Sequence, residues 1–147
     1  MACLAGLAAV PAGAANTSTT FTVSATVVAT CSVSASNLAF GSYTGTGNTD
    51  QTTTVTVTCG NGTSYSVALN DGANASGSTR RMANGSNYLA YELYSDSGRT
   101  TVWNAAAPVA GTGNGAAQTL TVYGRIPTGQ SVPAGAYTDT VQVTVTY

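Results

Sequence analysis

Apolar and polar residues alternate along most of the chain from residue 20 onward. In the first of these runs, 20–28, Thr and Ser occupy the even positions up to 26, and the larger apolar residues occupy the odd ones. A period of two is typical of a β-strand with one face in a core and the other in solvent. The runs predicted as strands are 20–28, 31–33, 54–59, 65–69, 87–96, 118–126 and 137–147. No run sustains the period of an amphipathic helix.

Stretches rich in Gly and Asn, such as 41–48 and 70–72, separate these runs and are predicted as loops and turns. Seven or so short strands joined in this way are typical of an antiparallel β-sandwich. We therefore expect an all-β fold, an Ig-like antiparallel sandwich.

The last run and the first run look complementary. The chain has few charged residues and no Lys, so the edges of these runs lack the charges that usually prevent strand pairing. A regular strand at the end of a chain also leaves one edge without a partner. We predict that the two runs pair between copies of the chain. The last run presents an apolar row at odd positions, namely Tyr137, Val141, Val143, Val145 and Tyr147, and the first run presents Phe21, Val23, Ala25 and Val27.

Composition excludes several kinds of chemistry. The 147 residues suit one domain, only 6% are charged, and the chain has no His and no Lys. Catalysis by an imidazole base, a Schiff-base lysine or a P-loop is therefore excluded. We expect no enzyme, no cofactor, no metal site and no small-molecule substrate. A net charge of −1 with four basic residues gives no basic patch for nucleic acid or an anionic membrane.

Residues 1–15 form a small, apolar, uncharged segment ending in Ala12-Gly13-Ala14. This pattern is typical of an export signal with a signal-peptidase site. An exported chain would then keep two cysteines, Cys31 and Cys59, and an even number favours a disulfide between them. Two buried free thiols are the alternative.

Charged residues that could form a ligand site are few. Asp96 and Arg99 are expected to close a turn between strands, and the Arg80-Arg81 pair to be solvated in a turn-rich segment. Glu92 and Asp139 are too scattered for the carboxylate pair of a glycosidase. Asp139 is instead expected to accept hydrogen bonds from backbone donors near the start of the last strand.

Aromatic residues offer a second candidate site. Trp103 and several tyrosines could form a platform for sugar stacking, but core and cross-strand packing is the preferred interpretation. Three glycosylation sequons are interpreted as turns, because Asn-Gly is a favoured turn dipeptide. The tyrosines are Tyr88, Tyr91, Tyr94 and Tyr123, and the sequons begin at Asn61, Asn74 and Asn84.

Motifs across the whole chain after residue 20 resemble one known family, the spore coat U domain family, which includes pilins of the archaic chaperone-usher pathway such as the major subunit of Csu-type pili. The ending is the most specific of these motifs. The motifs are Phe21-x-Val23-x-Ala25-x-Val27, Cys31-Ser32-Val33, Leu38-x-Phe40-Gly41-x-Tyr43, Val57-x-Cys59, Tyr88-Leu89-x-Tyr91-x-Leu93-Tyr94-x-Asp96 with Arg99 and Trp103, Val122-x-Gly124-x-Ile126-Pro127, and Pro133-x-Gly135-x-Tyr137-x-Asp139-Thr140-Val141-x-Val143-x-Val145-x-Tyr147.

The resemblance implies an incomplete Ig-like domain, residues 30–147, that is completed by the donor strand, residues 16–29, of a neighbouring subunit. It also implies a homopolymeric surface fibre that supports adhesion and biofilm formation. The implied partners are a periplasmic chaperone and an outer-membrane usher, with assembly in the periplasm and a final location in a cell-surface pilus. The alternative is a self-contained spore coat or extracellular matrix protein whose own first run fills its own groove.

Overall fold

The computed structural model describes residue 6 and residues 13–147, and this part of the chain contains strands and no helix. Most of the expected export segment, 1–15, lies outside the described residues. Among the residues described, no helix has the length and apolar character needed to cross a membrane.

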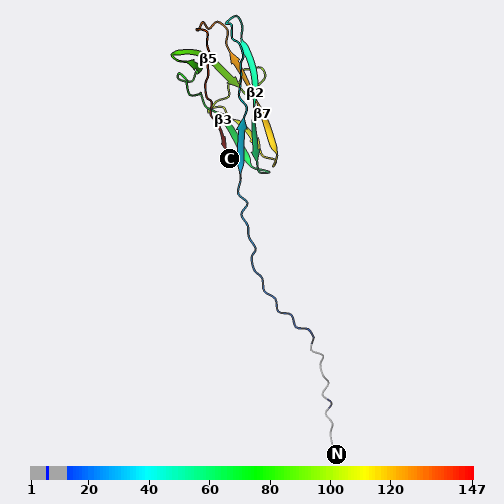
Figure 1. The fold of residues 1–147 in the computed structure, drawn as a ribbon. Helices are drawn as coiled ribbons and strands as arrows, with labels where there is room; N and C mark the ends of the chain where they lie inside the picture. The colour runs from blue at the N-terminus through cyan, green and yellow to red at the C-terminus, as the bar shows by residue number, and fades with distance from the viewer. Residues whose placement is uncertain (1–5, 7–12) are drawn as a thin grey trace, which may run out of the picture.

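The strands form two antiparallel sheets, which Figure 1 shows as one elongated domain. The larger sheet has five strands, in the order β1 (Cys31–Ala35), β2 (Thr49–Cys59), β7 (Ala117–Ile126), β5 (Asn87–Tyr94) and β4 (Arg80–Asn84). The smaller sheet has the order β6 (Val109–Thr112), β3 (Ser64–Leu69) and β8 (Val143–Thr146).

A single apolar core lies between the sheets. Alternation supplies it: Val55, Val57 and Cys59 are buried on β2, while the threonines between them are only half-buried. The smaller sheet contributes inward residues of β3, such as Val67, which is fully buried. The all-β antiparallel sandwich expected from the sequence is therefore confirmed.

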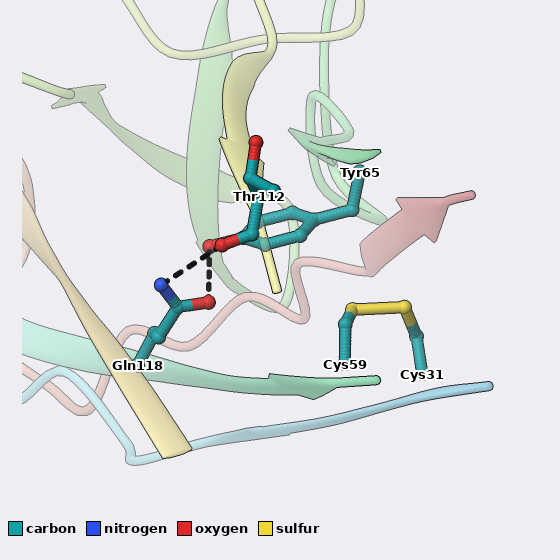
Figure 2. The surroundings of a disulfide bond; sticks show 5 residues. All are labelled: Cys31, Cys59, Tyr65, Thr112 and Gln118. Carbon is teal, nitrogen blue, oxygen red and sulfur yellow. Dashed lines mark hydrogen bonds between the residues drawn. A yellow bond between two sulfur atoms is a disulfide. The ribbon is translucent and has the colours of Figure 1, made fainter. Parts of the chain in front are cut away.

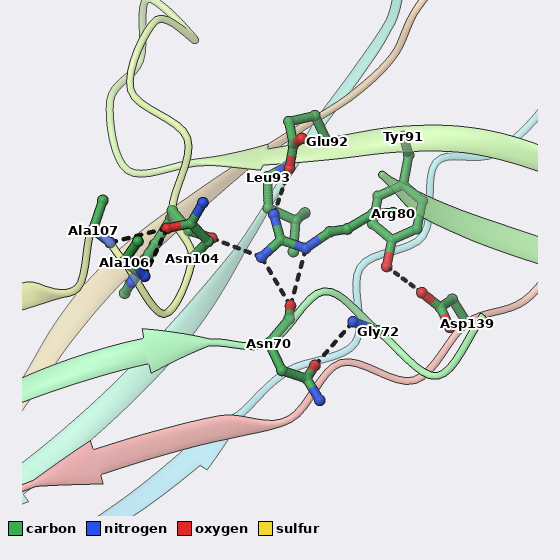
Figure 3. A network of polar contacts seen from close by, with 11 residues as sticks. Asn70, Gly72, Arg80, Tyr91, Glu92, Leu93, Asn104, Ala106, Ala107 and Asp139 are labelled. Atoms are coloured by element: carbon green, nitrogen blue, oxygen red, sulfur yellow. Dashed lines mark hydrogen bonds and ion pairs between the residues drawn. The ribbon is translucent and has the colours of Figure 1, made fainter. Parts of the chain in front are cut away.

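Strands β4 and β6 were not predicted, and the interpretation of Arg80 was wrong. Arg80 begins β4 and is fully buried rather than solvated. Its guanidinium pairs with the Glu92 carboxylate and donates hydrogen bonds to the backbone oxygen of Asn70 (Figure 3). It also donates to the backbone oxygen of Trp103. Burial is tolerated because these acceptors occupy the donors of the guanidinium.

The last predicted strand is shorter than expected. Only Val143–Thr146 forms β8, which pairs with β3. Upstream, Thr138 exchanges two backbone hydrogen bonds with Ala83 of β4. The segment 137–147, called the last segment below, therefore passes from the edge of one sheet to the edge of the other.

The first predicted run, 20–28, forms no strand in the structure. Residues 13–30 lie outside the strands, are exposed, and extend away from the domain (Figure 1). A strand needs a neighbour to accept and donate its backbone hydrogen bonds, and the described chain offers none to the run 20–28. We call 13–30 the N-terminal segment.

A disulfide joins Cys31 to Cys59, which lie directly opposite each other on β1 and β2 (Figure 2). On the facing sheet, the ring of Tyr65 lies over Gly111, where an added Cβ would come within 2.5 Å of it. The Tyr65 hydroxyl donates to Gln118 Oε1 at 3.2 Å, linking the two sheets.

The disulfide holds Cys31 where the N-terminal segment leaves the domain, at the end where residue 147 lies (Figure 1).

Candidate functional site

The first component of the site is the free edge of β1. This strand lies at the end of its sheet and pairs with β2 alone. The backbone oxygen of Thr30 accepts from Gly60, and the backbone N–H of Ser36 donates to Thr54. Because backbone groups of alternate residues point to opposite sides of a strand, those of Cys31, Val33 and Ala35 point away from β2. No strand of the described chain pairs with them.

The second component is the free edge of the last segment. Its even-numbered residues bond to β3, β4 and the chain between them: the oxygen of Thr140 accepts from Ala73, and that of Gln142 from Asn70. By the same alternation, backbone groups of the odd residues point to the other side. These residues are Asp139, Val141, Val143 and Val145, and their edge faces β1, which lies beside β8 without pairing with it.

A groove of about 490 Å³ lies between these two edges. We call it the β1–β8 groove. Its floor is the apolar core, and its walls are the end of β1 and the last segment. The residues that line it are Ala35, Ser36, Asn37, Leu38, Phe40, Thr53, Val55, Leu69, Met82, Tyr91, Leu93, Val122, Tyr137, Thr138, Asp139, Thr140, Val141 and Val143.

Burial along the groove shows that the core is uncovered there. Val33 lies opposite Val57 and therefore faces the same side of the sheet. Val57 is fully buried, whereas Val33 is 40% exposed. Val145 is likewise only half-buried, although its partner on β3, Val67, is fully buried. Inward-facing side chains at both edges thus lack the cover that a further strand would give.

The predicted apolar row of the last segment is located at this groove. Tyr137, Val141, Val143 and Val145 are half-buried and pack against the core, and the first three line the groove. Tyr147 is 59% exposed and lies beyond the lined part.

One carboxylate, that of Asp139, lies among the apolar groups of the groove. Its Oδ2 accepts a hydrogen bond of 2.7 Å from the Tyr91 hydroxyl (Figure 3). Its Oδ1 accepts from the backbone N–H and the side-chain amide of Asn74, at 3.1 and 3.0 Å. Burial, together with the hydrogen bond to Asp139, raises the pKa of Tyr91 well above its usual value, so the phenol stays a donor.

Gly72 completes the surroundings of this carboxylate. Its φ is 88°, and an added Cβ would lie 2.0 Å from Asp139 Oδ2. Only glycine therefore fits at this position. The expectation that Asp139 accepts from backbone donors matches the bond from Asn74, but its place in the groove could not be read from sequence spacing, because it depends on the contact between segments 70–74 and 137–140.

A second cavity, of about 930 Å³, continues the groove at the end opposite residue 147. Leu38, Phe40, Met82 and Tyr137 line both spaces. The loops that form it are tied by polar bonds: Gln130 donates its backbone N–H to the Tyr43 hydroxyl at 3.0 Å, and its side-chain amide bonds both backbone groups of Ala90.

The N-terminal segment presents the other predicted residues to solvent. Phe21, Val23 and Val27 are 86%, 82% and 95% exposed. Ala25, on the same alternating face, is exposed as well. Apolar side chains of this size at such exposure indicate a surface that a partner covers.

The other candidate sites have structural roles. Asp96 accepts hydrogen bonds from Thr100 and Thr101 and closes its loop, while Arg99 extends to the Gly124 oxygen and lies 3.6 Å from Asp50. Trp103 is 1% exposed and donates to the Val67 oxygen, so no sugar platform includes it. Among the described residues, no group of three His, Cys, Asp or Glu side chains could hold a metal ion.

Two comparisons with known proteins are informative. The chain is 39% identical over 80 residues to Protein U of Myxococcus xanthus, an alignment that covers 52% of this chain and 45% of that protein. It is also similar, with a TM-score of 0.65 and 25% identity, to a chain in the crystal structure of the CsuC–CsuE chaperone–tip adhesion subunit pre-assembly complex from archaic chaperone-usher Csu pili of Acinetobacter baumannii. That match covers 83% of this chain and 40% of the other.

The chain therefore spans less than half the length of these two relatives. The match that covers most of this sequence is to a domain family. The Spore Coat Protein U domain matches residues 17–144, a range that includes the run 20–28, the residues that line the groove and all but the final three residues of the last segment. This chain belongs to the Spore Coat Protein U domain family.

Proposed function

We propose that this protein is a non-enzymatic structural subunit of a surface fibre, in which the run 20–28 of one copy fills the β1–β8 groove of the next. The observation that carries the proposal is that each molecule has both a groove that lacks a strand and an exposed segment that could supply one. It has two facing free edges over an uncovered core, and an exposed alternating segment without a partner. Strand addition of this kind combines backbone hydrogen bonds with pockets for alternate side chains.

The position of the N-terminal segment supports head-to-tail assembly. The segment leaves the domain at the end where residue 147 lies (Figure 1). In a fibre with one orientation, the segment of a neighbour then enters the groove from the opposite end. Its direction runs against that of the last segment, so the donated strand is antiparallel to it.

The energy of the contact is sufficient for a stable fibre. Burying Phe21, Val23 and Val27 contributes about 1.5–3 kcal/mol for each side chain, or roughly 5–9 kcal/mol in total. Backbone hydrogen bonds to the two free edges add to this figure. The same exposed surfaces need protection before assembly, because free strand edges aggregate.

This need supports a periplasmic chaperone as a partner, and the likeness to a chain of a chaperone–subunit pre-assembly complex agrees with it. An outer-membrane usher, which would receive the subunit from the chaperone, completes the proposed pathway. The location is then the periplasm during assembly and the cell surface afterwards, where the fibre would support adhesion and biofilm formation.

A self-contained coat or matrix protein is the second candidate, favoured by the relation to Protein U and to the Spore Coat Protein U domain. It requires that the N-terminal segment fold back into its own groove. In the structure the segment extends away from the domain instead.

The test uses two adjacent substitutions. Val23→Asp would place a carboxylate in the apolar groove, at a cost of several kcal/mol, and should abolish fibres. Ser24→Asp places the same charge on the opposite face of the strand and should leave fibres intact. Electron microscopy of cells producing each variant measures fibre number and length, and co-purification with the chaperone checks folding. Wild-type fibres from Val23→Asp would remove this run as the donor strand.

A further inference from the structure

The β1–β8 groove and the run 20–28, called the N-terminal run below, match in length. Four inward positions of the last segment line the groove: Tyr137, Asp139, Val141 and Val143. The next inward residue, Val145, lies beyond the lined part, where β8 runs close to β1. The N-terminal run also presents four residues on one face, namely Phe21, Val23, Ala25 and Val27.

Antiparallel pairing gives these two sets a definite order. Residues directly opposite in such a pair face the same side of the sheet. When all four side chains lie in the groove, Val27 is opposite Tyr137, Val23 is opposite Val141, and Phe21 is opposite Val143. Ala25, the smallest of the four, is then opposite Asp139.

The Asp139 carboxylate cannot move aside for a larger side chain. Tyr91 and Asn74 hold it with three hydrogen bonds of 2.7–3.1 Å. Gly72 packs against it so closely that no Cβ would fit between them. The three donors are neutral, so the charge depends on its remaining exposure to water. Covering it with an apolar side chain would carry the cost of burying a charge without a cation.

Other alignments of the run cover this charge. A shift of two residues one way places Val27 opposite Asp139 and moves Phe21 beyond the lined part of the groove. A shift of two the other way places Val23 there and moves Val27 past Tyr137. A shift of one residue turns the polar face toward the core.

We propose that Asp139 sets the register of the donated strand, by accepting only a small side chain opposite it, which Ala25 of a second copy supplies. This inference rests on the proposed function. Asp139 is a specificity-determining residue of the groove, and the pairs 27/137, 25/139, 23/141 and 21/143 follow from it.

Paired cysteine substitutions test the register in intact fibres. Residues directly opposite lie within the distance that a disulfide bridges, whereas diagonal neighbours are roughly 7–8 Å apart and do not. A chain with Val23→Cys and Val141→Cys should give a ladder of covalent multimers on a non-reducing gel after mild oxidation. Val23→Cys with Val143→Cys is the matched control and should remain monomeric, as should each single variant.

Each outcome decides something. Multimers from Val23→Cys with Val141→Cys support the register. Multimers from the control pair, or from Phe21→Cys with Val141→Cys, which pair when the run shifts two residues the other way, overturn the register and keep the proposed strand donation. Intact fibres in which no pair forms multimers overturn both.

A coupling experiment tests the role of the carboxylate itself. Ala25→Val should lower the amount of assembled fibre by on the order of tenfold or more, because it covers the charge. Ala29→Val adds the same two methyl groups outside the groove and should have little effect. Asp139→Asn keeps an oxygen for the two Asn74 donors and turns its amide NH₂ toward the Tyr91 hydroxyl, which can accept a hydrogen bond. It removes the charge, so it should restore much of the fibre lost in Ala25→Val. An equal loss in both backgrounds would show that Asp139 does not select the residue opposite it.

Discussion

At the scale of single residues, the shape of the groove depends on a glycine that leaves room for its lining side chains. Gly124 faces inward on β7, and an added Cβ would lie 2.6 Å from Leu38 Cδ2 and 2.8 Å from Phe40 Cζ. Both neighbours line the groove. The sequence indicated a strand at this position, but the need for glycine follows from the loop that packs on it.

Gly124→Ala should therefore destabilise the protein by about 1–3 kcal/mol, because Leu38 and Phe40 must shift to make room. Gly47→Ala is the matched control: no atom lies within 4 Å of its added Cβ, so its effect should stay within about 0.5 kcal/mol. Denaturant unfolding of the two purified variants measures the difference. Equal stabilities would contradict the close contact at Gly124.

Cys31 and Cys59 support the groove in a different way, because their bond attaches the edge strand β1 to β2. Replacing both by Ser should lower the free energy of unfolding by about 3.5 kcal/mol, within a usual range of about 2–5 kcal/mol. Export yield should also fall, since a core with an open side has little reserve of stability.

Thermal unfolding with and without reductant provides the control. Reductant should lower the melting temperature of the wild-type protein and leave that of the Cys31→Ser, Cys59→Ser variant unchanged. A wild-type protein that is insensitive to reductant while its disulfide is reduced would refute a stabilising role.

At the scale of the strands, alternation predicted the strands whose apolar side chains form the core. It did not predict the strand and the side-chain cluster that polar contacts hold in place. Strands β2, β3 and β7 alternate clearly and were predicted. Strand β4 has the sequence RRMAN. Its first side chain, that of Arg80, is buried because an ion pair and hydrogen bonds satisfy its guanidinium, and not because it is apolar. The Asp139 cluster was missed for the same reason: its partners, Asn74 and Tyr91, come from segments that only the fold brings together.

Strands β2 and β7 are also linked by charge, and this link predicts a dependence on pH. Arg125 donates two hydrogen bonds of 2.7 Å to Asp50 across the pair. The bond from Arg125 lowers the pKa of Asp50 below its usual value. Backbone and side-chain donors of Thr101 and Thr100 lower the pKa of Asp96 in the same direction.

A carboxyl whose pKa is lowered by folding stabilises the folded state fully above its unfolded pKa, about 4. That stabilisation is lost as the pH falls through the lower, folded value. The free energy of unfolding should therefore be flat between about pH 5 and 7 and decrease below about pH 4. Asp50→Asn should be less stable at pH 7 and lose less on acidification. A variant with the wild-type acid profile would show that the pair contributes nothing.

At the scale of the whole molecule, the link between the N-terminal run and β1 distinguishes a fibre subunit from a self-contained protein. Three residues, 28–30, separate Val27 from Cys31. Folding the run back beside β1 requires these residues to form a hairpin loop, and such loops need at least two residues. Donation to another copy requires no reversal.

Deleting Val28 and Ala29 leaves one residue in the link and preserves the alternation of the run. In a fibre subunit the run does not contact its own domain, so the free energy of unfolding of the isolated monomer should stay within about 0.5 kcal/mol of wild type. In a self-contained protein the same deletion expels the run from the groove and removes roughly 5–9 kcal/mol of apolar burial. Val23→Asp in the monomer serves as the control, since it removes the same contact without shortening the chain. Loss of monomer stability in both variants would establish self-insertion and reject the fibre. Wild-type stability in both would show that the run does not occupy its own groove, as donation to a second copy requires.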